Sequence, residues 1–243
     1  MTDPATALVT GASSGIGAAI ARRLAQAGHK TIFCGRDVAR LAAAAGLGPL
    51  VHPLRLDMTD AAAIAALPGS LPPEFRRVGI LVNAAGHDVG GRRPFQDGAV
   101  EDWATIIDTN LTGVLRLTHT LLKGMLARGG GDVVIVGSLA TIRPAGRLAA
   151  YAASKAGLHA FSDALRADVS ARGIRVMEVL PGLTRTGFAE ARLRGDTAAA
   201  NRFYDKIDTA LTADDVAGAV LAALAQPRHV VTAQLVLTPP SQF

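Results

Sequence analysis

The chain contains little cysteine and few candidate metal ligands. Cys34 is the only cysteine among 243 residues, so the chain can form no internal disulfide and no cysteine cluster. It lies in an apolar, strand-like segment, where we expect a buried and unreactive thiol. The six histidines are scattered without ligand spacing, and we therefore expect no metal site.

Long apolar runs are also absent. Glycine, proline or charged residues interrupt each run well before the ~18 residues that a membrane span requires. The N-terminus lacks a basic-then-apolar signal pattern, so we expect a cytoplasmic protein without membrane partners. Apolar residues make up 49% of the chain, and no repeat or low-complexity linker divides it, which favours one domain over residues 1–243.

The formal net charge of +5 raises the question of a nucleic-acid partner. The basic residues are scattered, however, and aromatic residues amount to only 4% of the chain. Without basic and aromatic residues in alternation, we do not expect nucleic-acid binding. A basic surface suits an anionic cofactor or substrate equally well.

Short apolar segments alternate with helical patterns along the chain. The predicted strands are residues 5–10, 31–34, 51–56, 80–83, 133–137, 176–180 and 234–237. The predicted helices fall near residues 15–27, 37–45, 60–66, 99–127, 151–171 and 212–225. Strands without strict alternation, separated by helices, predict a single-domain α/β fold, a Rossmann-like doubly wound parallel sheet of about seven strands with helices on both faces. Ligands of such sheets bind beyond the carboxyl ends of the strands.

A glycine-rich turn, T-G-A-S-S-G-I-G, directly follows the first predicted strand and spans Thr10 to Gly17. Gly11, Gly15 and Gly17 permit a tight turn and a close approach of the backbone to a pyrophosphate. The N-terminus of the next helix presents free amide hydrogens to anionic oxygen. The position between strand and helix favours a nucleotide site over a structural turn. The Lys-Ser/Thr pair of a P-loop is missing, which argues against ATP hydrolysis.

The next two strand ends bear on the choice of cofactor. Sites that prefer NAD usually place a carboxylate at the tip of the second strand, where this chain has Gly35 followed by Arg36. An arginine there accommodates a 2′-phosphate, so NADP is favoured and NAD is possible, with a helix-surface role for Arg36 as the alternative. Asp57, after the third strand, is placed to accept from the adenine amino group or to cap the following helix.

The stretch Y-A-A-S-K places Tyr151 and Lys155 four residues apart in an Ala-rich helical pattern. Residues at this spacing share a helix face, so the two side chains can interact. A nearby ammonium favours the phenolate, and we expect it to lower the pKa of Tyr151 toward working pH. The pair predicts acid-base chemistry, and a solvated helix face is the alternative.

With these features in order, the sequence resembles the short-chain dehydrogenase/reductase family along nearly its full length. The glycine-rich turn, the Asn83-Ala-Ala-Gly86 motif and the Pro181-Gly182 pair carry the resemblance. The residues that fall where the family has its active-site side chains are Asn110, Ser138, Tyr151 and Lys155.

The resemblance implies an oxidoreductase that acts on CH–OH groups. Tyr151 would exchange a proton with the substrate oxygen while hydride moves to or from C4 of the nicotinamide, and Ser138 would hydrogen-bond the same oxygen. Lys155 would lower the phenol pKa and bind the nicotinamide ribose. Asn110 would hold a helix distortion and a water that links Lys155 to solvent, and Thr184 would meet the carboxamide. The predicted cofactor contacts are Gly11, Ser13, Ser14, Gly15, Ile16, Gly17, Arg36, Asp57, Asn83, Ala84, Gly86, Tyr151, Lys155, Pro181, Gly182 and Thr184.

A narrower likeness follows the sixth strand. The segment L-P-G-L-T-R-T-G-F-A-E-A-R-L-R-G-D is similar to the branch of NADP-dependent 3-hydroxy acid and serine dehydrogenases, in which residues near 183–210 would form a substrate lid. A lid arginine, Arg185 first and otherwise Arg192 or Arg194, can clamp a substrate carboxylate, and an exposed lid surface is the alternative. His87, at the mouth of the site, is a further predicted substrate contact, with a loop hydrogen bond to Asp88 as the alternative.

The leading hypothesis is an NADP-dependent oxidoreductase acting on a small polar alcohol or carbonyl such as a 3-hydroxy acid. Reduction of 3-oxoacyl thioesters is a second enzymatic hypothesis, and a non-catalytic NADP-binding sensor is a third. The intact set of Ser138, Tyr151 and Lys155 weighs against the sensor. By resemblance we also expect a tetramer or dimer that pairs through the helices near 99–127 and 151–171.

Overall fold

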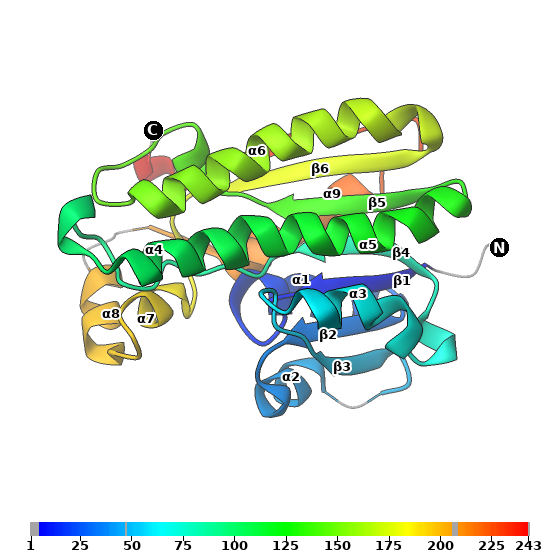
Figure 1. Cartoon of the computed structure of the whole chain (residues 1–243), viewed down its shortest axis with the longest axis horizontal. Helices are drawn as coiled ribbons and strands as arrows, with labels where there is room; N and C mark the ends of the chain where they lie inside the picture. The colour runs from blue at the N-terminus through cyan, green and yellow to red at the C-terminus, as the bar shows by residue number, and fades with distance from the viewer. Residues whose placement is uncertain (1–4, 47, 206–208, 243) are drawn as a thin grey trace.

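The predicted strands pair into one parallel sheet in the order β3-β2-β1-β4-β5-β6-β9. The computed structural model describes residues 5–46, 48–205 and 209–242 (Figure 1). The strands are β1 (Thr6–Thr10), β2 (Thr31–Gly35), β3 (Val51–Arg55), β4 (Val78–Asn83), β5 (Gly131–Val136), β6 (Ile174–Pro181) and β9 (Gln234–Leu237). Their bounds lie within two residues of the prediction, and the parallel α/β fold is confirmed.

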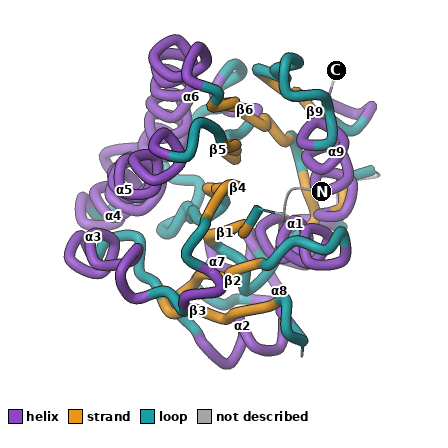
Figure 2. The backbone as a smooth tube through the Cα atoms, turned by 90° about the vertical axis from the view of Figure 1, so that its right-hand side faces the viewer, coloured by secondary structure: helices purple, strands orange, loops and turns teal. Residues whose placement is uncertain are grey.

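Helices cover both faces of this sheet, as Figure 2 shows. One layer contains α3 (Ala61–Ser70), α4 (Val100–Ile107), α5 (Gly113–Ala127) and α6 (Ala149–Val169), and the other contains α1 (Gly15–Gln26), α2 (Val38–Ala45) and α9 (Ala213–Leu224). Each face has its own apolar cluster. Along β1, Leu8 belongs to one cluster, whereas Ala7 and Val9 belong to the other. Burial on both faces explains why the strands lack polar alternation.

The strand order reverses between β1 and β4, which is where ligands bind in doubly wound sheets. Thr10, the last residue of β1, ties the two strands together at this point. Its Oγ1 accepts from the backbone N–H groups of Ala84 and Ala85, at 3.0 Å each. The hydroxyl therefore sets the position of the chain just beyond β4.

The predicted continuous helix over residues 99–127 is wrong in one respect. A π-helical turn, Asp108–Thr112, separates α4 from α5. Asn110 in this turn is fully buried and donates through Nδ2 to the His87 carbonyl at 3.0 Å and to Ser154 Oγ at 3.1 Å. Its Oδ1 accepts from the His87 N–H at 2.9 Å. The widened turn thus brings an amide side chain to the segment after β4, a position that regular helical periodicity does not predict.

Between β6 and α9 the chain forms a small substructure beyond the carboxyl ends of the strands (Figure 1). It contains β7 (Thr184–Arg185), α7 (Phe188–Arg192), α8 (Thr197–Tyr204) and β8 (Leu211–Thr212), and β7 pairs with β8 in parallel. Ala189, Ala200 and Tyr204 form its apolar centre. Part of the predicted lid, residues 206–208, lies outside the described residues. Among the helices that the structure describes, none has the length and apolar character needed to cross a bilayer.

Candidate active site

A cavity of about 690 Å³ lies at the carboxyl ends of the central strands. Its lining comes from the glycine-rich turn, from the residues that follow β2 to β6, from α6 and from the α7–α8 segment. Residues as distant in sequence as Thr10 and Gln242 contribute to it. The volume suits a small-molecule site of ordinary size.

The glycine-rich turn packs closely against its surroundings. Gly11 and Gly15 have φ angles of +65° and +57°, in the left-handed region that favours glycine. A Cβ atom on Gly17 would lie 2.5 Å from the carbonyl oxygen of Gly11. Ser14 is the N-cap of α1, yet its side chain makes no capping hydrogen bond, so the first amides of α1 are available to a ligand in the cavity. This arrangement is suited to binding phosphate oxygens.

Two arginines line the cavity near the end of β2. Arg36 and Arg40 both contribute to the lining, although the sequence predicted a phosphate contact at Arg36 alone. Asp37, between them, caps α2 by accepting from the N–H of Arg40 at 3.1 Å. The cap holds the start of α2 in place, and the two guanidinium groups give this end of the cavity a positive charge.

Asp57 lines the cavity and does not cap the following helix. Its carboxylate accepts from the N–H and the Oγ1 of Thr59, at 2.9 and 2.8 Å. The backbone hydrogen bond from Thr59 is the main reason that the pKa of Asp57 lies below its ordinary value. The cap of α3 is Asp60, which accepts from the N–H of Ala63. The capping alternative for Asp57 is therefore wrong.

Asn83 does not line the cavity, which corrects its assignment as a cofactor contact. As the last residue of β4, it is 1% exposed and directs its side chain toward α5, where Nδ2 donates to Thr118 Oγ1 at 3.1 Å. The alternation of side chains along a strand turns it away from the cavity. Ala84, Ala85 and Gly86 line the cavity instead.

Tyr151 and Lys155 both face the cavity from α6. Lys155 is 5% exposed, which excludes the solvated-face alternative. Its Nζ donates to the carbonyl oxygen of Val136 at 2.8 Å and lies 5.8 Å from the centre of the Tyr151 ring. Ser138, which follows Gly137 just beyond the end of β5, lines the same cavity, and its side chain acts to lower the pKa of Tyr151. The structure thus brings these three side chains together.

The expected direction of the Tyr151 pKa is wrong for this structure. Burial raises the pKa of Tyr151 above its ordinary value, and the side chain of Ser138 opposes this rise. The negative charge of Asp88 raises it further, and the positive charge of Arg192 lowers it. Burial also lowers the pKa of Lys155 to about 8, and the charge of Glu178 opposes that change. Desolvation, which spacing in a sequence does not report, determines the direction of both shifts.

His87 and Asp88, after β4, have separate partners. His87 lines the cavity, and its Nε2 lies 3.2 Å from Thr109 Oγ1. Burial lowers the pKa of His87, which favours the neutral form of its ring. Asp88 is 2% exposed and accepts from Arg192 Nε at 2.8 Å. Burial raises the pKa of Asp88, and the charge of Arg192 opposes the rise.

Arg185 does not fit its predicted role as a substrate contact. Its side chain turns toward α8, where the guanidinium lies 5.0 Å from the centre of the Tyr204 ring and Nη2 donates to the Tyr204 carbonyl at 3.2 Å. Among the lid arginines, Arg192 lines the cavity. Its guanidinium lies 5.4 Å from the centre of the Phe188 ring, and that ring meets Tyr151 edge-on at 5.7 Å.

The remaining predicted contacts line the cavity, and the structure adds others. Ser13, Ser14, Ile16, Pro181, Gly182 and Thr184 are part of the lining. The added residues include Arg92, Arg143 and Gln242. Gln242 Oε1 accepts from the N–H of Leu183 at 2.7 Å. No spacing in the sequence relates residues so far apart. Asn110 lies behind the lining, bonded to His87 and Ser154.

Comparison with known proteins agrees with this geometry. The model of the short chain dehydrogenase family matches residues 5–196. Serine 3-dehydrogenase of Agrobacterium fabrum is 39% identical over 98% of this chain and 94% of its own length. The NADP-dependent 3-hydroxy acid dehydrogenase YdfG of Salmonella typhi is 40% identical over 92% of this chain and 90% of its own. A solved closed form of serine dehydrogenase complexed with NADP+ superimposes with a TM-score of 0.94 at 38% identity, covering 98% of this chain and 96% of that one.

The chain therefore belongs to the short-chain dehydrogenase family, and the resemblance drawn from its motifs is confirmed. As a member of this family it is a nicotinamide-dependent oxidoreductase.

Proposed function

We propose that the protein is an NADP-dependent dehydrogenase that interconverts a small 3-hydroxy acid and the corresponding 3-oxo acid. One observation carries the proposal: a single cavity joins a cationic dinucleotide end, at Arg36 and Arg40, to a tyrosine–serine–lysine group beside Arg192. The relatives named above act, by their names, on serine and on 3-hydroxy acids, which supports a substrate of this class.

The residues present fit NADP. The close-packed turn at Gly11 and Gly17 and the uncapped start of α1 would hold the pyrophosphate. Arg36 and Arg40 would pair with the 2′-phosphate, because a guanidinium binds phosphate oxygens through paired N–H groups. Asp57 would accept from the adenine amino group. Toward the nicotinamide end, the proposed contacts are Ala84, Gly86, Tyr151, Lys155, Pro181, Gly182 and Thr184, all of which line the cavity.

In the proposed mechanism the bound cofactor supplies hydride to, or accepts it from, the substrate carbon. The Tyr151 hydroxyl gives a proton to the oxygen as a carbonyl is reduced and takes one as an alcohol is oxidised. Ser138, which lines the cavity with Tyr151, would donate to the same oxygen and stabilise its developing negative charge. The ammonium of Lys155 stabilises the phenolate that forms. Asn110, held in the π-helical turn, orders the segment beside Lys155.

The acid group of the substrate is proposed to bind at Arg192. Arg92 also lines the cavity, and Asp88 contacts Arg192 from behind the lining. Asp88 and Glu190 balance the formal charge of the two arginines, so the carboxylate would be held by direct pairing with the guanidinium N–H groups rather than by a net positive charge. Phe188, packed against Tyr151, limits the space for a long acyl chain. We further propose that residues 183–210 form a lid over this end, and that His87 contacts substrate at its mouth.

The test is a substrate screen with NADPH and NADH against small 3-oxo acids, matched 3-oxo esters and 3-oxoacyl thioesters, followed by reduced nicotinamide absorbance. We expect turnover of the free acids with NADPH and at least a tenfold preference over the neutral esters. Equal or better turnover of thioesters would favour the second enzymatic hypothesis. NADPH binding without turnover of any carbonyl would favour the sensor.

The oligomeric state of the protein and its location in the cell are two further points to test. We propose that α4, α5 and α6 pair between copies of the chain to give a dimer or tetramer, a state that light scattering coupled to size-exclusion chromatography measures directly. The predicted cytoplasmic location stays a prediction that cell fractionation can test.

A further inference from the structure

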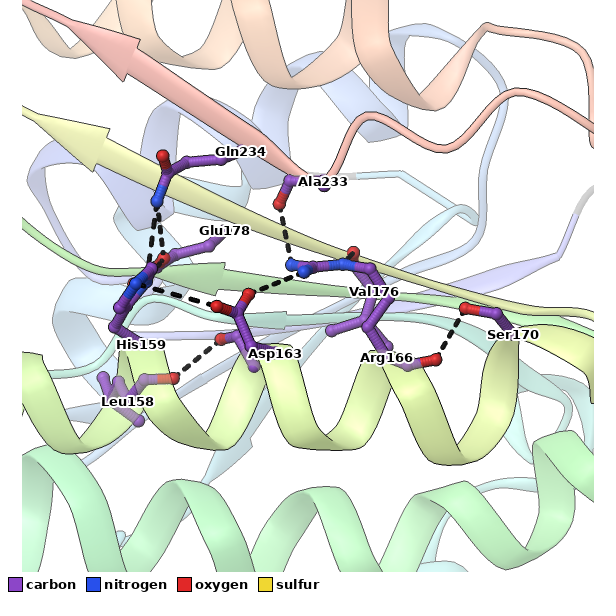
Figure 3. A network of polar contacts seen from close by, with 10 residues as sticks. Leu158, His159, Asp163, Arg166, Ser170, Val176, Glu178, Ala233 and Gln234 are labelled. Atoms are coloured by element: carbon purple, nitrogen blue, oxygen red, sulfur yellow. Dashed lines mark hydrogen bonds and ion pairs between the residues drawn. The ribbon is translucent and has the colours of Figure 1, made fainter.

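Glu178 is a fully buried acid in β6, the strand next to the edge strand β9. It lies on β6, in register with Ile135 of β5 and Gln234 of β9, and is 0% exposed. His159 Nδ1 lies 2.6 Å from Oε2, and Gln234 Nε2 donates to the same oxygen at 3.3 Å (Figure 3). The other oxygen, Oε1, has no hydrogen-bond partner among the described residues. A buried carboxylate with an unsatisfied oxygen is unfavourable for folding, so its presence calls for a functional reason.

The carboxylate lies close to the active-site lysine. Lys155 and His159 are one turn apart on α6 and so share the face that meets the sheet. Lys155 Nζ contacts the carbonyl oxygen of Val136, and a Cβ atom on the next residue, Gly137, would lie 2.8 Å from Glu178 Oε1. The ammonium and the carboxylate therefore both adjoin the Val136–Gly137 segment at the end of β5. Both groups are excluded from solvent, so water screens their attraction only weakly.

The other charges near Glu178 largely compensate one another. Asp163 and Arg166, on the same helix, form an ion pair of 2.6 Å, and Asp163 lies 3.7 Å from His159 Nε2. Gln234, from β9, is neutral. Glu178 is the group that favours the charged form of Lys155, against the effect of burial.

We propose that Glu178 is a positioning residue for the reaction: its buried carboxylate, held by His159 and Gln234, keeps the Lys155 ammonium charged at the end of β5. The inference rests on the proposed function, which gives the Lys155 charge its role toward Tyr151. Glu178 itself touches neither substrate nor cofactor in this proposal. Its effect passes through Lys155.

The first test measures the charge of Lys155 directly, without substrate or cofactor. The chain has four lysines, Lys30, Lys123, Lys155 and Lys206, so ¹³Cε labelling of lysine gives a simple NMR spectrum, and Lys155→Met identifies the Lys155 signal. Glu178→Gln keeps the size of the side chain and removes its charge. We expect the titration midpoint of Lys155 to fall by about one unit in this variant. An unchanged midpoint would overturn the proposal.

Asp132→Asn is the matched control. Asp132 is also a buried acid of the sheet, on β5, but it binds Arg175 at 2.6 Å and Arg228 at 2.8 Å rather than the active site. Its replacement should lower stability and leave the Lys155 midpoint in place. An equal fall in both variants would mean that a general destabilisation of the fold, and not the loss of the Glu178 charge, changes the titration midpoint of Lys155. If Glu178→Gln does not fold, Glu178→Met with His159→Leu removes both partners of the hydrogen bond and should show the same fall.

The second test is the pH profile of turnover. In Glu178→Gln, Lys155 should lose its charge at a lower pH than in the wild type, so kcat should begin its alkaline fall at a lower pH. Glu178→Asp should move this fall part of the way back toward the wild-type pH. A uniform loss of kcat at every pH would contradict the proposal. If the wild type turns over no substrate at all, the proposed function fails, whereas the NMR titration still decides the role of Glu178.

Discussion

Arg192 of α7 donates through Nε to Asp88 at 2.8 Å, and this contact joins the lid to the loop after β4. The pair is nearly excluded from solvent, with side-chain exposures of 12% and 2%. A second pair, Arg194 with Asp102 at 2.7 Å, joins the lid to α4 on the surface, where Arg194 is 61% exposed. The two pairs share a chemistry and differ in burial, so they allow a matched comparison.

Asp88→Asn should impair the lid far more than Asp102→Asn. Removal of one partner from a buried ion pair leaves an uncompensated charge, whereas an exposed pair contributes about 0–1 kcal/mol. We expect kcat/KM to fall about tenfold or more in Asp88→Asn, with faster tryptic cleavage within the lid. Asp102→Asn should stay within about threefold of wild type. Equal effects in steady-state kinetics would show that the buried contact does not hold the lid.

Tyr151→Phe should separate binding from turnover. Loss of the hydroxyl removes the proposed proton donor, and kcat should fall by roughly 10²–10⁴, while NADPH binding measured by fluorescence stays near wild type. The other tyrosine, Tyr204, supplies the control because its hydroxyl donates to carbonyls within the lid, at 3.1 and 3.2 Å. Tyr204→Phe should cost far less in kcat. A Tyr151→Phe enzyme with normal kcat would remove the assigned role.

Arg36→Ala should weaken the binding of NADPH much more than that of NADH. The lost charge-assisted contact is worth about 1.5–3 kcal/mol, or at least tenfold in Kd, and only the phosphorylated cofactor would make it. Arg40→Ala should act in the same direction. Arg22→Ala, on the exposed surface of α1, serves as the control. Isothermal titration with both cofactors measures the difference, and parallel losses for the two would refute the phosphate contact.

Lys155→Met should stabilise the protein at pH 7. The folded pKa of Lys155 is about 8 against an ordinary value of 10.5, so the unfolded chain binds this proton more tightly. Below pH 8 the folded state therefore carries the whole penalty, about 3 kcal/mol, and the penalty fades as pH rises from 8 to 10.5. Loss of the bond to Val136 offsets about 1 kcal/mol of the gain. Urea unfolding at several pH values measures the result.

The control for that prediction is Lys123→Met, because Lys123 is exposed on α5. It should change the free energy of unfolding by less than about 0.5 kcal/mol at any pH. A Lys155→Met protein that is no more stable than wild type at pH 7 would show that the buried lysine charge does not destabilise the folded state.

The sequence predicted those parts of the molecule that depend on neighbouring residues. Buried parallel strands are short apolar runs, and the glycine-rich turn and the Tyr151–Lys155 spacing are local, so each was recognisable. The periodicity did not show the π-helical turn at Asn110, because the helical pattern continues on both sides, and only the family resemblance implied a helix distortion there. Asn83 was misassigned because one step along a strand reverses the face that a side chain occupies.

The orientation of the side chains of the lid arginines could not be predicted without the structure. α7 has five residues, too few for a periodicity that would separate an inward Arg192 from an outward Arg185 before the helix. The direction of the Tyr151 pKa shift could not be predicted from the sequence either, since desolvation by the packed α6 and Phe188 depends on the whole fold. Contacts such as Arg192 with Asp88 join residues about a hundred positions apart, and no local pattern encodes them.

The hydrogen bond between Gln242 and Leu183 has a practical consequence for handling the protein. Gln242 lines the cavity, and its carbonyl oxygen also accepts from Arg143 at 3.1 Å, so the two hydrogen bonds fasten this residue to both walls of the site. An affinity tag fused close to Gln242 would disturb these two hydrogen bonds, and trimming the chain before Gln242 would remove part of the cavity wall. A tag is therefore better placed ahead of β1, because Thr6 begins this strand at its amino end and the cavity lies at the carboxyl ends of the strands.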